Sequence, residues 1–286
     1  MDRLRHFIKR NGNGGGKGNG HASQGNGASS EPLPAPAKQG GHGDHWGCIF
    51  RAVEQDRMLA LIQDVVANDS RPDGFQAPGG GAAYHSSSSP VRMCVLLAGG
   101  TLESAYPEAL PGTEWPIVVR EVIPWANGIE GQITGECHGA SISFFDTRFY
   151  TNRNKYRVGE EHTFRMSAFA YTVSRASDAE VEIGTGTRVS LKGARAYMPA
   201  NIGANPDADI DEYWFHSPLE SAASEAEFAG RRLHALPITM AIPGDFEMSL
   251  VLYAAGHTLD SNTDLTTPEE LDLEGYLWLQ GYMAYL

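Results

Sequence analysis

One short segment carries the residues best suited to binding an anion or a nucleobase. Cationic and aromatic side chains are concentrated between positions 146 and 157, and the candidate ligand-binding residues are Asp146, Arg148, Tyr150, Arg153, Lys155, Tyr156 and Arg157. Cations neutralise backbone phosphates and rings stack on bases, so the segment predicts a groove for single-stranded nucleic acid. The more ordinary interpretation is a charged hairpin, with Asp146 and Arg148 paired on its solvent face and Tyr156 packed beneath.

A second group could bind a transition metal. His42, Asp44, His45 and Cys48 lie within seven positions, and His85 is available from a serine-rich loop. A structural zinc needs four ligands, and no second Cys/His pair stands at the usual spacing. We therefore interpret these residues as scattered histidines in a glycine-rich segment and expect no metal or other cofactor.

Alternating acidic residues form a third candidate site. Asp207, Asp209 and Asp211 match the first three ligand positions of a calcium loop. Glu212 stands where such a loop needs glycine, and Pro218 where it needs a bidentate glutamate. The pattern favours a solvated acidic loop over a calcium site.

Motifs for covalent catalysis are absent from the sequence. It has no G-x-S-x-G elbow and no phosphate-binding loop with its lysine. Cys137 and His138 are adjacent, so on a strand they point to opposite faces and cannot form a dyad. An enzyme would need a site built from residues distant in sequence, marked by a pocket where Asp, Glu and His side chains converge.

The elements that position these residues begin with a helix predicted over residues 45–68. Apolar residues recur there at three- and four-residue steps, and polar residues occupy the other face. Glycine, serine and proline predict a loop over 78–90. The following segments are predicted as strands because they are β-branched or alternate in polarity: 91–98, 115–125, 129–136, 140–150, 162–174, 181–191 and 194–198.

The remaining segments complete the prediction. Ser217, Pro218 and Glu220 have the spacing of a capped helix start, which predicts a helix over 217–228. Residues 236–242 and 246–254 predict a hairpin, and the apolar end of the chain, 275–286, predicts a core strand.

These elements indicate an α+β fold with mostly antiparallel strands, one long N-terminal helix and a single domain over residues 45–286, with its β-rich core at about 91–286. Gly131, Gly135 and Gly139 lie where bulges would let a sheet curl. The pattern from about Ile117 to Leu286 resembles in outline the oligonucleotide/oligosaccharide-binding (OB) barrel, which implies a curled five-stranded core. A β-sandwich would give almost the same pattern.

Charge is unevenly distributed along the chain. The sequence has 22 Lys and Arg against 35 Asp and Glu, a net charge of -13. Residues 1–44 carry +3, residues 45–204 carry -3 and residues 205–286 carry -13. Residues 1–44 are rich in glycine, asparagine and proline, which predicts a flexible, disordered tail. The acidic surface disfavours broad nucleic-acid binding.

Composition limits location and class. The sequence has 41% hydrophobic residues but no apolar window long enough for a membrane span, and no signal peptide is evident. Its three cysteines, Cys48, Cys94 and Cys137, are widely spaced, which predicts buried free thiols in a cytoplasmic protein. We therefore expect a non-enzymatic binding or structural module that associates with a protein partner or with itself. The alternatives are a nucleic-acid-binding barrel using Arg148 to Arg157, and an enzyme of the kind described above.

Overall fold

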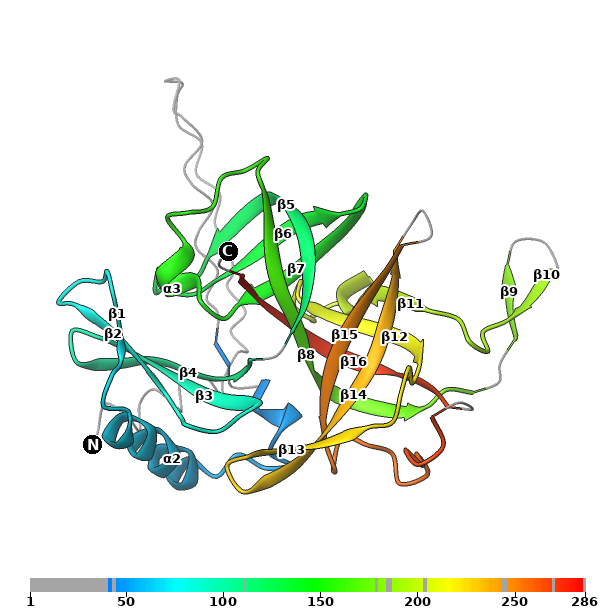
Figure 1. Cartoon of the computed structure of the whole chain (residues 1–286), viewed down its shortest axis with the longest axis horizontal. Coiled ribbons are helices and arrows are strands. Elements are labelled where there is room, and N and C mark those ends of the chain that lie inside the picture. Colours follow the sequence, from blue (N-terminus) through cyan, green and yellow to red (C-terminus); the bar gives the residue numbers. More distant parts are fainter. Residues whose placement is uncertain are drawn as a thin grey trace, which may run out of the picture.

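The computed structural model describes residues 41–42, 45–110, 112–177, 180–183, 187–202, 205–242, 246–268 and 271–284. Figure 1 shows a small sheet with a helix beside it, next to a larger and strongly curled sheet. Apart from 41–42, the predicted tail over residues 1–44 lies outside the described residues. No described helix has the length and apolar character needed to cross a membrane.

The small sheet has four antiparallel strands in chain order. These are β1 (Asp73–Phe75), β2 (Gly81–His85), β3 (Val91–Ala98) and β4 (Thr101–Ala109). Strand β3 matches its predicted range, and the Gly99 and Gly100 turn returns the chain as β4. Helix α2 (Gln55–Asn68) packs on β2 and β3 through one apolar face that includes Met58 and Ile62.

A closed five-stranded barrel confirms the predicted curling of the sheet. Its strands are β5 (Thr113–Pro124), β6 (Gly131–Cys137), β7 (Ala140–Asp146), β8 (Glu161–Arg175) and β16 (Asp272–Met283). The order is β16, β7, β6, β5, β8, and β8 pairs again with β16 to close the barrel. The contact between β7 and β16 is parallel, and the others are antiparallel. The bulges lie in β5, at Arg120, and in β8, at Tyr171, rather than at the glycines themselves.

Further strands continue from β16 and β8, the two strands that close the barrel. One extension runs from β16 through β12 (Glu212–Pro218) to β11 (Ala196–Pro199), which the short turn η2 (Ala200–Ile202) follows. The other extension runs from β8 through β15 (Phe246–Ala255) and β14 (Arg231–Ile242) to β13 (Ser224–Phe228). The pair β9 (Glu180–Ile183) and β10 (Thr187–Ser190) projects away from the rest in Figure 1.

Two hydrophobic clusters hold these layers together. One fills the curled sheet and includes Phe144, Phe164 and Leu277. The other joins α2, the small sheet and the outside of the barrel, and includes Cys94, Phe145 and Trp278. The turn η1 (His45–Cys48) belongs to this second cluster, and the three cysteines are free and buried, as predicted.

The structure corrects three predicted elements. The helix over 45–68 is interrupted: η1 and α2 are separate because Ile49 and Phe50, which follow η1, are buried in the second cluster instead of continuing the helix. The predicted loop over 78–90 contains β2. The predicted helix over 217–228 is absent, since the Ser217 hydroxyl accepts a hydrogen bond from the Thr239 amide across the sheet instead of capping a helix.

Candidate functional site

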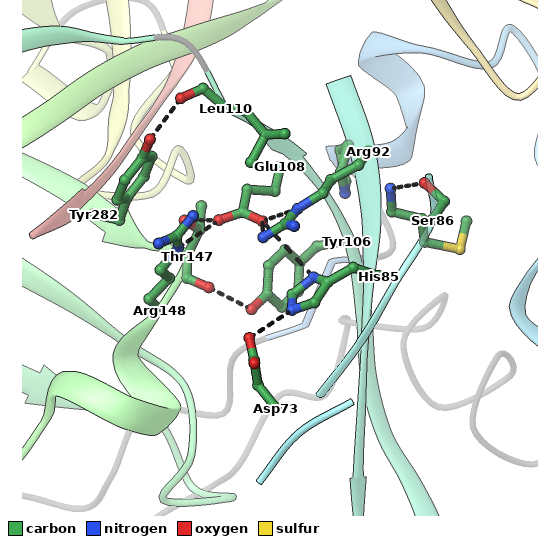
Figure 2. A network of polar contacts seen from close by, with 12 residues as sticks. Asp73, His85, Ser86, Arg92, Tyr106, Glu108, Leu110, Thr147, Arg148 and Tyr282 are labelled. Carbon is green, nitrogen blue, oxygen red and sulfur yellow. Dashed lines mark hydrogen bonds and ion pairs between the residues drawn. The ribbon is translucent and has the colours of Figure 1, made fainter. Parts of the chain in front are cut away.

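A buried ion cluster joins the small sheet to the barrel. At its centre is Glu108 of β4, whose side chain is fully buried. Arg92 lies directly opposite on β3, and its Nη2 is 2.6 Å from Glu108 Oε2. From the barrel side, Arg148 Nε and the Thr147 hydroxyl each donate to Oε1 over 3.1 Å. Figure 2 shows the Glu108 carboxylate between the two guanidinium groups.

The barrel side of the cluster is fixed by an aromatic ring and by backbone contacts. The Arg148 guanidinium lies 4.0 Å from the ring centroid of Tyr282, a residue of β16. Burial alone would lower the pKa of Arg148, but the Glu108 carboxylate outweighs burial and raises that pKa. The Tyr106 hydroxyl donates to the Thr147 carbonyl over 2.7 Å. Tyr106 and Glu108 of β4 therefore both bind Thr147 in the loop after β7.

On its other side the cluster reaches His85, at the end of β2. His85 Nδ1 lies 3.9 Å from Glu108 Oε2, and Nε2 lies 3.4 Å from Asp73 Oδ2. Neither ring nitrogen has a hydrogen-bond partner among the described residues. Burial lowers the pKa of His85 and Arg92 lowers it further, against smaller opposing effects of Glu108 and Asp73. The imidazole is therefore neutral at pH 7 and has a nitrogen lone pair to offer.

His85 and Arg92 open onto a hollow of about 680 Å³ between α2 and β2. It is lined by Asp64, Val65, Asn68, Asp69, Ser70, Arg71, Asp73, His85, Ser86, Ser87 and Arg92. Burial alone would raise the pKa of Asp69, but the amides of Arg71 and His85 donate to its carboxylate and hold that pKa below its usual range. This carboxylate stays charged at neutral pH.

The hollow brings Asp and His side chains together, as an enzyme would require, but it lacks an activated nucleophile among the described residues. The nearest hydroxyl in sequence, on Ser86, accepts from the Met93 amide and pairs with the Ser88 hydroxyl, each over 2.8 Å. His85 makes no hydrogen bond to a serine or cysteine there.

The seven residues predicted as a ligand site do not form a hairpin. Strand β7 ends at Asp146, and the chain turns through the short helix α3 (Phe149–Asn152) before β8, which is not a neighbour of β7. Arg148 is the one member of the seven in the Glu108 cluster. Tyr150 is buried against Phe75, with ring centroids 5.1 Å apart.

The other predicted residues mostly bind their own chain. Arg153 donates to the carbonyls of Gly128 and Gln76, and Lys155 to Asn152 Oδ1 over 3.1 Å. Arg157 donates to the carbonyls of Asn154 and Tyr156, each over 2.9 Å. The Tyr156 hydroxyl donates to Asp146 inside the barrel end, and both residues are buried.

The metal candidates are likewise engaged with other parts of the chain, although the His42 and His45 ring centroids lie only 5.5 Å apart. His42 bonds Glu130, His45 bonds Tyr171, and Asp44 lies outside the described residues. Asp211 is buried and accepts from the Trp278 indole over 3.2 Å, whereas Asp207 is exposed. No group of three or more metal-binding side chains occurs among the described residues.

Sequence reasoning missed Glu108, Arg92 and the hollow. The sequence alone gives the wrong register: a hairpin folded at Gly99 and Gly100 would pair Arg92 with Pro107, and only the bulge next to Leu96 and Leu97 brings Arg92 opposite Glu108. Comparison with known proteins adds no guide to the site, because no protein family, curated protein or solved structure matches this chain.

Asp146 supplies a pH-dependent prediction. Burial raises its pKa to about 7, although Tyr156 and the Arg148 amide partly oppose this. The pKa of this carboxyl is higher in the folded protein than the unfolded value of 3.8. The folded protein therefore loses stability as the pH rises from about 4 to 7. We expect Asp146→Asn to remove this loss, which amounts to up to about 4 kcal/mol.

The measurement is urea unfolding of both proteins at pH 4.5 and 7.5. Asp207→Asn, at an exposed carboxylate, is the control, and its free energy of unfolding should change between the two pH values as much as that of the unaltered protein. An equally large change in Asp146→Asn would contradict a buried carboxyl with a raised pKa.

Proposed function

We propose that this protein is a non-enzymatic binding module that takes a cationic side chain of a protein partner, a second copy of itself included, into the hollow beside His85. The observation that carries the proposal is the balance of charges there. Asp64, Asp69 and Asp73 line the hollow against Arg71 and Arg92, and Arg92 is already paired with the buried Glu108. Negative charge is therefore in excess.

The chemistry of the hollow suits an ammonium or guanidinium group. The Asp73 carboxylate beside His85 supplies an acceptor, and His85, whose pKa burial lowers, adds no competing positive charge at neutral pH. Hydrogen bonds between charged groups contribute about 1.5 to 3 kcal/mol each. The ion cluster behind His85 holds the floor of the hollow in place, so that little ordering is needed on binding.

The chain itself contains a segment of the required charge. Arg3, Arg5, Lys9 and Arg10 lie within the first ten residues, while the C-terminal third is strongly acidic. A second copy could thus present these cations to the hollow. This supports association between copies as one form of the proposed binding.

The test uses a fluorescent peptide of residues 1–10 and the full chain with Arg3, Arg5, Lys9 and Arg10 replaced by glutamine, so that its own segment does not compete. We expect binding in fluorescence polarisation that weakens with salt. Asp73→Asn should reduce the affinity about tenfold, the equivalent of roughly 1.4 kcal/mol. Asp207→Asn removes the same charge at an exposed site outside the hollow and should change the affinity less than about twofold.

Absence of binding, or equal losses in the two variants, would contradict the proposal. A single-stranded oligonucleotide in the same assay tests the alternative. The closed five-stranded barrel, with α3 between β7 and β8, supports an OB-like comparison, in which the face of β6 and β7 would bind. That face carries no Lys or Arg, and Tyr213 bonds both backbone groups of Ser143 there. We therefore rank nucleic acid second.

A further inference from the structure

A second polar site lies farther along the same face of β4. Ser104 and Tyr106 alternate with Glu108 and so face the barrel with it. Here the ring of His42 is enclosed by other rings. The distances from its centroid are 4.7 Å to Phe145, 4.9 Å to Tyr106, 4.9 Å to Trp125 and 5.6 Å to Trp278. We call these four rings, together with the Glu130 carboxylate, the aromatic cage.

Glu130 gives the cage a buried acceptor. Its Oε1 accepts from His42 Nε2 over 2.7 Å and from the Ser104 hydroxyl over 2.6 Å, and its Oε2 accepts from Asn127. The side chain is only 4% exposed. Ring faces carry negative potential, so several rings around a carboxylate form an environment that attracts organic cations, methylated ammonium groups above all.

Two polar atoms in the cage region have no hydrogen bond within the described part of the chain. The Trp125 indole nitrogen and His42 Nδ1 are both buried and have no hydrogen-bond partner among the described residues. Leaving a buried polar atom unpaired is unfavourable. Moving the imidazole into water would let Nδ1 form a hydrogen bond, which lowers the cost of displacing His42.

His42 is also held weakly by its backbone. Its carbonyl accepts from the Trp46 amide over 3.3 Å, which is a long hydrogen bond. The buried turn η1, which includes Trp46 and Cys48, begins only at His45. Among the described residues, this long hydrogen bond is the backbone contact between His42 and η1.

We propose that the aromatic cage is a binding site for an organic cation of the methylated-ammonium class, and that His42 is an internal occupant which such a ligand displaces. Displacement makes a specific prediction. A ligand that competes with a resident group binds with an affinity reduced by the fraction of time the site is free. Removing His42 should therefore strengthen binding, whereas loss of a supporting residue would weaken it.

The probe is tetramethylammonium chloride, titrated against sodium chloride of equal ionic strength and followed by tryptophan fluorescence, to which Trp125 and Trp278 of the cage contribute. We expect His42→Ala in the full chain to bind at least about tenfold more tightly than the unaltered protein. His234→Ala, at a partly exposed histidine outside the cage, is the matched control and should change nothing. Adding Glu130→Gln to His42→Ala should weaken binding by about tenfold or more.

A second measurement covers the case in which His42→Ala folds poorly. In the unaltered protein, the NMR signals of the His42 ring should move on addition of tetramethylammonium as the ring leaves the cage. Equal affinity with and without His42, or His42 signals that stay unchanged at saturating probe, would overturn the proposal. Asp73→Asn should leave this binding intact, so failure here is distinguishable from failure of the hollow to bind cationic peptides.

Discussion

Glu108→Gln is expected to lower the free energy of unfolding by about 3 to 5 kcal/mol. The amide has nearly the same shape as the carboxylate but no charge, so Arg92 and Arg148 are left facing each other without an anion between them. Their side chains are only 18% and 23% exposed, and water can compensate little of this loss. Urea unfolding followed by circular dichroism measures the change.

The matched control is Glu114→Gln, which removes a carboxylate of the same type from the surface. Glu114 pairs with Arg165 over 3.0 Å, and about half of each side chain is exposed. Exposed pairs of this kind contribute about 1 kcal/mol or less. If Glu108→Gln were no more costly than Glu114→Gln, the ion cluster would not hold the small sheet to the barrel as we describe.

Gly275→Val is expected to destabilise the fold by at least about 3 kcal/mol and to leave most of the protein unfolded or aggregated. Gly275 lies on β16 between β12 and β8, where the barrel closes. A Cβ atom at this position would lie 1.9 Å from the Thr172 carbonyl oxygen, and backbone cannot move aside as a flexible side chain can. The yield of soluble protein and its urea midpoint measure the effect.

Gly256→Ala is the control for Gly275→Val. Gly256 follows β15, and a Cβ atom there would meet no heavy atom within 4 Å. We expect a change within about 0.5 kcal/mol. A Gly275→Val protein as stable as Gly256→Ala would show that β16 does not pair closely with both neighbours at this position.

The local sequence pattern correctly predicted strands that are simple apolar runs. Strand β3, the hairpin of β14 and β15 and the terminal strand β16 are apolar runs that end at breakers, and all three occur. The helix expected over 217–228 failed because Ser217 pairs with Leu273 of the distant strand β16, whereas Phe228 pairs with Arg231 across the two-residue turn at Ala229 and Gly230. Pairing with β16 and β14 overrides a capping preference that contributes about 1 kcal/mol.

The site was less predictable than the fold. Arg148 was recognised as a candidate, but its role depends on Glu108, which is 40 positions earlier in a strand that no pattern indicated. A glutamate and a proline in β4 argue against a buried strand until the partners Arg92 and Arg148 are known. Tyr150 and Tyr156 have the composition of a stacking surface, yet both are buried, because ring exposure is set by tertiary packing.

The central claim is that the hollow beside His85 receives cationic side chains. Its most direct test is an NMR titration of the ¹⁵N-labelled protein, carrying the four glutamine replacements, with the peptide of residues 1–10. Our account predicts that the largest amide shifts fall at Asp69, Arg71, Asp73, His85 and Ser86. Shifts centred on β6 and β7, or no shifts at saturating peptide, would contradict it.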